Sequence, residues 1–503
     1  MEKTILGIDI GTSSIKCSLF NLDGKEVYAL SSTYPTIRSG AGELEIDTED
    51  IFSSLIGNIK DLLEETKERF SIEAIGLCAV MIMPVFLDSH DNVARPIIHW
   101  FDNRPYKQYE KLREQKKDLM IADLSGSSLT AEGTINSVLW VKENEPEVYK
   151  KTKRFFQLKD YARFRLTGDI CTDYGDASGT QLFDSRNWKW NEPLISELGF
   201  KKSMFCNTKK PTEIAGTVTK EISLLTGLRQ GIPVAVGSGD GITTIFGLGI
   251  FREGHTGITV GSAGVVATPS KTYPKDNDMR NYIFCHPFGD RWFSLMATAS
   301  SGEVFKWYKE NILKDTPKTL SELEDEAARS SVPGASGLTF LPYILGARNP
   351  LSDPKAYGVL LGMRHHHQRA DITRAVLEGL SLEILDIIEA QKDIFRKIDL
   401  EVGDYKLSGG ILKGTLWKNM LADIIGEDLT VTGSEELGCL GSAMYASVAS
   451  GAYPDLKEAV SNMVKDKGVI KHDRKNIDTY SKKYSAFKKT YGLFKDRFDD
   501  LVI

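Results

Sequence analysis

The segment from Asp9 to Lys16 combines residue types that could bind a phosphate group. Gly11 lets a ligand come close to the backbone because it has no side chain. The hydroxyl groups of Thr12 and Ser13, with nearby backbone amides, could converge on phosphate oxygens. Asp9 and Lys16 carry opposite charges that could hold a metal ion and an anion. Hairpin turns use the same residue types, so an ordinary turn is an equally good interpretation of this segment alone.

Two further turns rich in glycine and hydroxyl groups follow strand-like runs in the second half of the chain. One contains Gly261 and Ser262, and the other contains Gly409 and Gly410. Each is a weak signal alone. The sequence has neither the P-loop pattern GxxxxGK[ST] nor the dinucleotide-binding pattern GxGxxG. We therefore expect a nucleotide to be held between two domains by backbone amides and by close approach at the glycines.

Asp240 lies among three glycines at the end of an apolar run. Its carboxylate could face a cleft there, and the flanking backbone could approach a substrate. Aspartate is also a common N-cap, and a helix is expected to begin at Gly241. Capping and substrate contact are compatible roles.

The segment His99 to Arg104 contains an indole, a carboxylate, an amide and a guanidinium within six residues. The carbon face of a polyhydroxylated ligand could pack on Trp100, while Asp102 binds its hydroxyl groups. The alternative is a loop in which Asp102 pairs with Arg104 and Trp100 packs into the protein.

The elements that would position these residues follow the same order in both halves. This order predicts α/β domains, each with a mixed sheet flanked by helices. We place the domain boundary near residue 250, and we expect domains 1–250 and 251–503 to share a packed cleft because no flexible linker is evident. The expected elements are strands at 4–11, 14–20 and 26–29, a helix at 48–69 capped by Thr48, a strand at 74–87, then a strand at 232–237, a helix at 241–248 and a strand at 257–267.

Composition argues against several classes of protein. The 503 residues carry 63 basic and 69 acidic side chains, so no excess positive charge would attract nucleic acid. The six cysteines form no CxxC pair and show no zinc-ligand spacing, and we expect reduced thiols in a cytoplasmic protein. The longest apolar stretch, Ile75 to Leu87, is too short to span a membrane.

Together these segments resemble the FGGY carbohydrate kinases, a family of the actin-like ATPase superfamily. The resemblance covers nearly the whole chain. It implies two actin-like (ribonuclease H-like) domains with a cleft between them, the first binding sugar and the second binding nucleotide. The last helix could pack back on the first domain. The matching segments are Asp9–Lys16, Gly42–Asp47, Leu158–Tyr161, Leu166–Gly168, Thr172–Thr180, Gly358–Met363 and Asp371–Glu378.

The resemblance also implies individual roles. Asp240 matches the catalytic base of the family, and Asp9 matches the acid that orients Mg²⁺. ATP phosphates would be held by the Gly11 turn, with Lys16 beside it, and from the other side by Gly261 and Ser262. The residues that would border the adenosine pocket are Gly302, Gly409 and Gly410, and those near the sugar are Val80, Met81, Ile82, Trp100 and Asp102.

One departure from the family concerns the sugar. Residues 78–83 read Cys-Ala-Val-Met-Ile-Met where xylulose kinases typically have Ser-Gly-Gln-Met-His-Gly, so Val80 and Ile82 replace two polar side chains. If both line the pocket, a sugar hydroxyl loses a partner at a cost of about 1–3 kcal/mol. That cost could change the preferred sugar. Ser262 stands in place of the usual threonine, a mild change that keeps the hydroxyl group, and Ser137 stands where a lysine is usual, which breaks the first signature of the family.

We expect a kinase for a xylulose-type pentulose. A sugar acid or polyol such as gluconate or glycerol is an alternative substrate, and an actin-like ATPase switch or a regulatory pseudokinase is an alternative of another class. The expected partner is a small sugar or polyol, with neither nucleic acid nor membrane, and a homodimer is left open.

Overall fold

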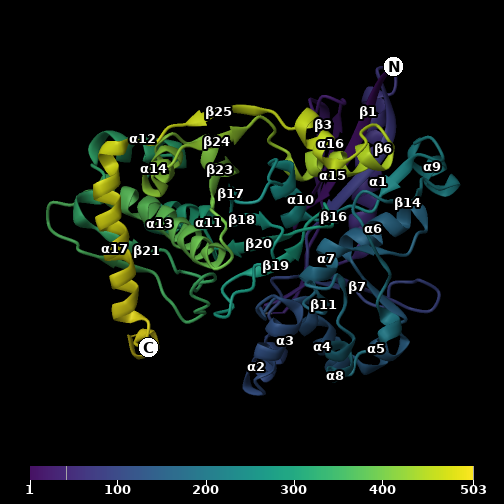
Figure 1. The fold of residues 1–503 in the computed structure, drawn as a ribbon, viewed down its shortest axis with the longest axis horizontal. Coiled ribbons are helices and arrows are strands. Elements are labelled where there is room, and N and C mark those ends of the chain that lie inside the picture. The colour runs from purple at the N-terminus through teal and green to yellow at the C-terminus, as the bar shows by residue number, and fades with distance from the viewer. Residues whose placement is uncertain (41, 502–503) are drawn as a thin grey trace.

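The computed structural model describes residues 1–40 and 42–501. Two seven-stranded sheets form the centres of two lobes, the first on the right and the second on the left of Figure 1. In sheet order, the strands of the first are β14 (Ile214–Thr217), β15 (Pro233–Ala235), β6 (Phe70–Ala79), β1 (Glu2–Ile10), β2 (Ser14–Phe20) and β3 (Glu26–Thr33), with β16 (Ser238–Gly239) also paired to β6. Those of the second are β19 (Tyr282–Cys285), β20 (Trp292–Ala297), β18 (Gly264–Ser270), β17 (His255–Val260), β23 (Gly403–Ser408), β24 (Leu429–Thr432) and β25 (Asp466–Ile470).

The two sheets share one arrangement around their central strands. β1 pairs antiparallel with β2 and parallel with β6. β17 likewise pairs antiparallel with β18 and parallel with β23. The mixed sheets expected from the sequence are therefore confirmed. No strand of either sheet lies between residues 240 and 254, the stretch that contains the expected domain boundary near residue 250.

Helices cover both faces of the first sheet, which explains why β1 is almost continuously buried from Thr4 to Ile10. Helix α1 (Thr48–Thr66) turns its apolar stripe inward, including fully buried Leu55 and Ile59. Its N-cap is Asp47, whose side chain accepts a hydrogen bond from the Glu49 amide at 2.9 Å. The expected cap Thr48 is instead the first residue of the helix.

The other face of the first sheet is covered by helices that come late in the sequence. α15 (Leu437–Ala449) and α16 (Leu456–Met463) share a buried cluster with β1 and β6 and lie beside the N-terminal strands in Figure 1. A Cβ atom on Gly7 would overlap the carbonyl oxygen of Cys439, so the helix packs directly on the backbone of β1.

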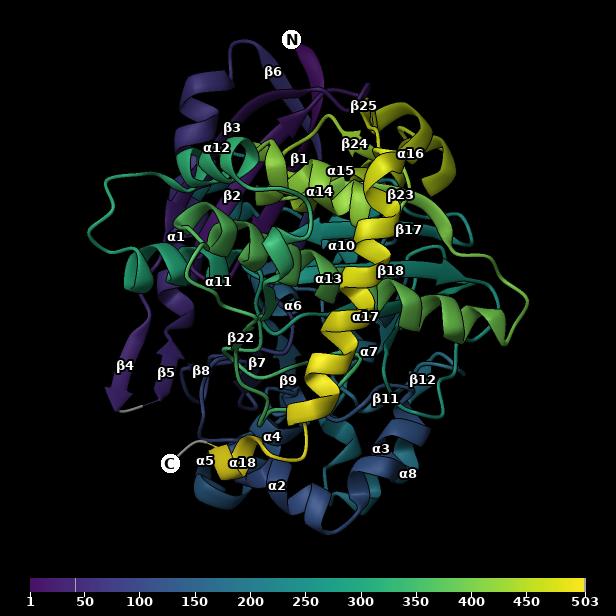
Figure 2. The same cartoon turned by 90° about the vertical axis from the view of Figure 1, so that its left-hand side faces the viewer.

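The last long helix belongs to the second lobe. α17 (Ile477–Phe494) packs on β21 (Thr339–Leu341), α13 (Arg369–Arg396) and α14 (Leu416–Ile425), and Figure 2 shows it in front of the second sheet. The suggestion that the last helix packs back on the first domain was wrong, because α17 packs on the second lobe. The helices α15 and α16 pack on the first domain instead.

The first lobe carries a large helical extension between β6 and β15. Figure 2 shows most of these helices together at its lower end. The elements of the extension are β7 (Pro84–Leu87), β8 (Ile97–Ile98), α2 (Tyr106–Glu114), α3 (Lys117–Ser125), α4 (Thr134–Asn144), α5 (Pro146–Lys151), β9 (Arg154–Gln157), α6 (Leu158–Thr167), β10 (Thr172–Asp173), α7 (Tyr174–Gly179), β11 (Phe183–Asp184), β12 (Lys189–Trp190), α8 (Glu192–Glu197), β13 (Thr208–Lys209) and α9 (Lys220–Thr226).

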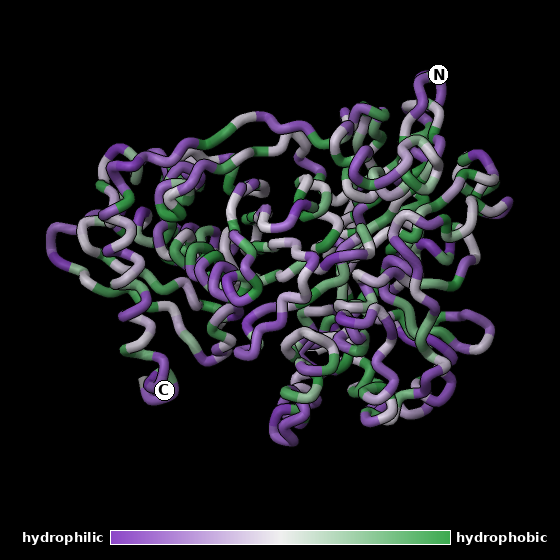
Figure 3. The backbone as a smooth tube through the Cα atoms, viewed as in Figure 1, coloured by the Kyte–Doolittle hydropathy of each residue, from purple (hydrophilic) through white to green (hydrophobic). Residues whose placement is uncertain are grey.

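The remaining elements complete the two lobes. They are β4 (Ile37–Gly40), β5 (Glu43–Ile46), α10 (Asp240–Gly247), α11 (Gly302–Trp307), α12 (Leu320–Ser330), β22 (Val359–Leu361) and α18 (Phe498–Leu501). Figure 3 shows hydrophobic stretches inside both lobes and hydrophilic ones mostly on loops and helix ends. Within the described part of the chain, no helix combines the length and apolar character needed to cross a membrane.

Candidate active site

The turn at Gly11, which the sequence predicts to hold phosphate, joins β1 to β2. The Gly11 amide donates to the carbonyl oxygen of Ser14 at 2.9 Å, which closes the turn. The Tyr34 hydroxyl donates to the Gly11 carbonyl oxygen, and the Trp100 indole nitrogen donates to the Thr12 hydroxyl at 3.4 Å. Ser13 is exposed at the tip. The turn is thus held by side chains and presents its hydroxyl groups outward.

Asp9 lies just before this turn on β1. Burial raises the pKa of its carboxyl group above the ordinary range, although a hydrogen bond from the Cys78 thiol at 3.4 Å acts in the opposite direction. The start of α15 lies against it, because a Cβ atom on Gly438 would be 2.5 Å from an Asp9 oxygen. The Asp9 carboxyl group therefore lies between its own strand β1, the neighbouring strand β6 and the start of α15.

Lys16 is placed beside the same turn but has a partner within the protein. Its Nζ lies 2.6 Å from Oε2 of Glu436, immediately before α15. The lysine side chain is 41% exposed, so it remains accessible to a ligand. The sequence predicted Lys16 as a phosphate residue and did not identify Glu436, which is distant in sequence.

Asp240 is the first residue of α10 and follows the short strand β16. β16 extends along β6, with Ser238 opposite Cys78, and this register brings Asp240 to the same end of the sheet as Asp9. Burial and the negative charge of Asp9 raise the pKa of Asp240 to about 7, although backbone amides including that of Gly241 donate to it. Gly239 is the N-cap residue of α10, and the Asp240 carboxylate accepts from the Gly241 amide at 2.7 Å, so it also satisfies an amide in the first turn of this helix.

The second turn predicted to hold phosphate, at Gly261 and Ser262, joins β17 to β18 and is held by backbone groups. The Gly302 amide, at the start of α11, donates to the Gly261 carbonyl oxygen at 2.9 Å, and the Ser301 amide donates to that of Ser262 at 2.6 Å. A Cβ atom on Gly302 would lie 2.5 Å from the Gly261 oxygen. Immediately after the neighbouring strand β23, Gly409 has a φ of +96°, and a Cβ atom there would lie 2.5 Å from the carbonyl oxygen of Val260, the residue before Gly261. The structure therefore brings together Gly261, Gly302 and Gly409.

A cavity of about 650 Å³ opens beside Gly409 and Gly410, a size that suits a nucleotide. Gly409 and Gly410 line it from the second lobe, and Lys16 lines it from the first. Its other lining residues include the cations Lys413, Lys418 and Lys467. Lys16 and residues of the second lobe thus line one space, whereas Gly261, Ser262 and Gly302 are not among its lining residues.

On the sugar side, the loop 99–104 has an internal ion pair. The Asp102 side chain is fully buried, with Oδ2 accepting from the Leu44 amide at 2.7 Å and pairing with Arg104 at 2.7 Å. Trp100 is partly buried and stacks on Phe101 with ring centroids 3.5 Å apart. The loop thus matches the second interpretation of its sequence, in which Asp102 pairs with Arg104 and Trp100 packs against the protein.

The expected strand 74–87 is interrupted beside Asp240. β6 ends at Ala79 and β7 begins at Pro84. Val80 is 7% exposed and belongs to the core of the first lobe, so it does not line an open pocket. Ile82 has a φ of +60°, rare for a β-branched residue, and is partly exposed. Met81 lies against the backbone at Gly239, next to Asp240.

Comparisons with known proteins agree with this geometry. Residues 4–247 match the model of the N-terminal domain of the FGGY family of carbohydrate kinases, and residues 258–450 match that of its C-terminal domain. The chain belongs to the FGGY family of carbohydrate kinases. It is 29% identical over 495 residues to a xylulose kinase of Bacillus subtilis (strain 168), covering 98% of both chains. It is 26% identical to a gluconokinase of the same strain, covering 92% of this chain and 91% of the other.

A structural comparison confirms the actin-like fold of this FGGY kinase. The crystal structure of ligand-bound xylulose kinase from Lactobacillus acidophilus superposes with a TM-score of 0.92 at 24% identity, covering 99% of this chain and 100% of that chain. This FGGY kinase is therefore an ATP-dependent sugar kinase, a phosphotransferase with an alcohol group as acceptor.

The sequence analysis did not identify the distant partners of the first turn or a buried polar cluster behind β16. Tyr34 holds the first turn from 23 residues away, and Glu436 pairs with Lys16 across 420 residues. Neither has a local signal, because only the folded sheet brings them to the turn. The sequence also gave no role to a buried polar cluster behind β16, although Lys159 and Asp160 are unusual in a helix whose inner face is apolar.

Proposed function

We propose that this kinase phosphorylates a hydroxyl group of a xylulose-type ketose with Asp240 as the general base. The observation that carries the proposal is a carboxyl group with a pKa near 7, placed beside Asp9 and a phosphate-type turn. A base is most effective when its pKa is close to the working pH. Asp240 would accept the proton of the attacking hydroxyl group while the two turns hold the triphosphate in line.

The residues around Asp9 fit a metal ion that arrives with the nucleotide. Mg²⁺ in phosphate sites usually binds through one or two carboxylates, with phosphate and water as the other ligands. Asp9 is one such carboxylate, and within residues 1–40 and 42–501 no group of three or more His, Cys, Asp or Glu side chains could hold a metal ion. When bound, Mg²⁺ would offset the charge of the triphosphate.

The protein's own groups account for binding and orientation. In the first lobe, the Gly11 turn offers amides and hydroxyl groups to the phosphates, and Lys16 could exchange Glu436 for a phosphate oxygen. In the second lobe, the turn at Gly261 and Ser262 would hold the phosphates from the opposite side. Closure of the two lobes would exclude water, which otherwise competes with the sugar for the phosphoryl group.

The choice of a ketose rests on the relatives and on the residues beside Asp240. The B. subtilis xylulose kinase is 29% identical and the gluconokinase 26% identical. Trp100, Met81 and Ile82 are the exposed or partly exposed candidates for contact with the sugar, whereas Val80 lies in the core. Asp102 would orient the loop through Arg104 instead of binding the sugar directly.

A substrate panel tests this function. ADP formation would be measured with D-xylulose, D-ribulose, gluconate, glycerol and no acceptor. We expect a ketopentose to have the highest kcat/KM and ADP release without acceptor to be negligible. A gluconate or glycerol kcat/KM above that of every ketose would overturn the ketose assignment, and acceptor-independent ADP release would favour an ATPase switch.

A variant separates the role of residue 82 from that of residue 80. Ile82→His adds a polar group at a partly exposed position, and a hydrogen bond worth about 1–3 kcal/mol would change kcat/KM for D-xylulose about ten- to a hundredfold. Val80→Gln is the matched control, because an amide buried in the core should lower stability without creating a sugar contact. Equal kcat/KM for D-xylulose in Ile82→His and the parent protein would remove residue 82 from the sugar site.

A further inference from the structure

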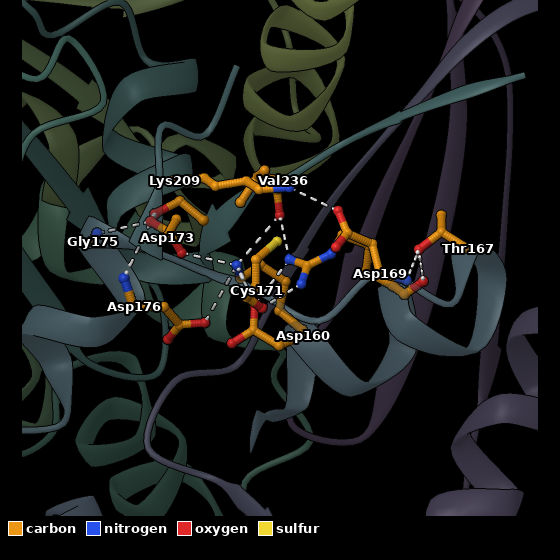
Figure 4. A network of polar contacts seen from close by, with 12 residues as sticks. Asp160, Thr167, Asp169, Cys171, Asp173, Gly175, Asp176, Lys209 and Val236 are labelled. Carbon is orange, nitrogen blue, oxygen red and sulfur yellow. Dashed lines mark hydrogen bonds and ion pairs between the residues drawn. The ribbon is translucent and has the colours of Figure 1, made fainter. Parts of the chain in front are cut away.

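Behind the strand that carries Asp240 lies a cluster of charged side chains that the phosphoryl transfer itself does not use. Lys159 and Arg163 on α6 face Asp160 on the same helix and Asp173 on β10. All four side chains are at most 1% exposed. Figure 4 shows Asp160, Asp173, Asp176 and Val236 in one network of polar contacts, and Val236 lies two residues before β16.

The cluster forms hydrogen bonds with two residues of the segment that leads to Asp240. The Val236 carbonyl oxygen accepts from Lys159 Nζ at 3.3 Å and from Arg163 Nη1 at 3.1 Å. Two residues later, the Ser238 hydroxyl donates to Asp173 Oδ2 at 2.6 Å. Asp173 is itself fixed by Lys159 at 2.8 Å. A continuous chain of polar contacts therefore joins α6, β10 and the strand two residues before Asp240.

The residue between Val236 and Ser238, Gly237, packs directly against the backbone of β6. Gly237 has a φ of +70°, and a Cβ atom there would overlap the carbonyl oxygen of Leu77 on β6. The strand is thus held between the backbone of β6 on one side and the charged cluster on the other. Any movement of Ser238 would move Asp240, which is separated from it by one glycine.

The charges in the cluster balance. Lys159 and Arg163 face Asp160 and Asp173, and burial raises the pKa of the third acid, Asp176, well above its usual range, which favours its neutral form. Buried ion pairs are rarely more stabilising than well-packed apolar side chains, because each ion loses its hydration. A gain in stability therefore does not account for this buried cluster. Its hydrogen bonds to Val236 and Ser238, which fix the strand that leads to Asp240, account for it better.

We propose that Ser238, held by the buried Asp173–Lys159 pair, is a positioning residue for the carboxylate of Asp240. The inference rests on the proposed role of Asp240 as the base. A reacting group that is misplaced by about 1 Å can lose a hundredfold in rate. Removal of the Ser238 hydroxyl should therefore affect the chemical step and leave nucleotide binding unchanged, because that hydroxyl bonds to Asp173 and belongs to neither glycine turn.

Ser238→Ala tests this directly. Asp173 would keep Lys159 and the amides of Gly175 and Asp176, so no charge is left unpaired and the fold should persist. We expect kcat to fall at least tenfold, KM for ATP to stay within twofold and the midpoint of the pH–kcat curve to move. Ser238→Cys, which keeps the size and a weaker donor, should recover part of the rate and serves as the second variant if Ser238→Ala is unstable.

Ser178→Ala is the matched control. Ser178 is fully buried on α7, and its hydroxyl bonds to Gly175 and Cys285 without contacting β16. We expect a comparable loss of thermal stability with kcat and the pH midpoint unchanged. Equal losses of kcat in Ser178→Ala and Ser238→Ala would overturn the positioning role.

A double variant separates this inference from the proposed function. If Ser238 acts only through Asp240, adding Ser238→Ala to Asp240→Asn should leave the residual rate unchanged. The same fold-loss in both backgrounds would mean a general structural effect and would reject the inference. Failure of the proposed function is a different result, in which Asp240→Asn itself retains more than a tenth of the parent rate.

Discussion

The two glycine turns of this kinase occupy equivalent places in their sheets. They differ in the side chain that precedes the turn and in the groups that hydrogen-bond to it. Two residues before its glycine, the first turn has the acid Asp9, whereas the second has Thr259, whose hydroxyl bonds to Ser408 at 2.9 Å. The first is held by the side chains of Tyr34 and Trp100, and the second by backbone amides at the start of α11. The same strand–turn–strand arrangement thus occurs in both lobes, with a carboxylate beside the turn in the first and a pair of bonded hydroxyl groups beside it in the second.

The largest expected effect tests where the chemistry lies. Asp240→Asn should lower kcat by about 10²- to 10⁴-fold, the usual contribution of a general base. ADP binding by calorimetry should be unchanged because the amide keeps the shape of the side chain. Thr259→Val in the second lobe is the counterpart and should change kcat only a few-fold. A larger loss in Thr259→Val than in Asp240→Asn would reverse the division between the lobes.

The pH dependence of kcat should report the same acid. Because the pKa of Asp240 is raised to about 7, the base is increasingly protonated below that pH. With saturating substrates, kcat should fall about tenfold per pH unit below 7 and reach a plateau above it. A flat profile between pH 5.5 and 8 would contradict a base with this pKa.

A substitution in the second lobe should affect binding more than turnover. Gly302→Ala would place a methyl group 2.5 Å from the Gly261 carbonyl oxygen, so the second turn must shift. We expect KM for ATP to rise about tenfold with a smaller change in kcat. Gly492→Ala on α17 is the control, since a Cβ there meets no atom within 4 Å. Unchanged KM for ATP in Gly302→Ala would show that the turn does not bind the phosphates.

The smallest effect concerns the support of the first turn. Tyr34→Phe removes the donor to the Gly11 carbonyl oxygen, and one such hydrogen bond contributes about 0.5–1.5 kcal/mol. kcat/KM for ATP should therefore fall between two- and tenfold. A loss above a hundredfold would mean that the phenol itself takes part in the reaction.

The sequence predicted what is encoded locally and missed what the fold assembles. The strand–turn–strand at Asp9, the glycine turn at Gly261 and the acid at Asp240 were found because residue type and turn chemistry coincide within a few positions. Tyr34 and Glu436 were missed because their contacts depend on sheet order. The strand expected over 74–87 was too long because apolar residues continue through 80–83, where the backbone turns and Ile82 adopts a positive φ.

Residue-type arguments were also incomplete for the sugar side. Val80 and Ile82 are adjacent in the sequence to the same strand end, yet one is in the core and the other is partly exposed. Alternation along an interrupted strand cannot distinguish them. Asp102 was ambiguous for a related reason, because only three-dimensional contacts show that Arg104 and the Leu44 amide occupy its oxygens.

The packing of α15 against β1 has a consequence for protein engineering. Residues 437–463 pack on the first lobe, although they lie in the sequence between the other strands of the second sheet and its last strand, β25. No single cut in the chain can therefore release two self-sufficient halves, and a fragment ending near residue 250 would expose the apolar face that α15 covers. A split version of this enzyme would have to supply that helix in trans, which also offers a way to make its activity depend on the joining of two pieces.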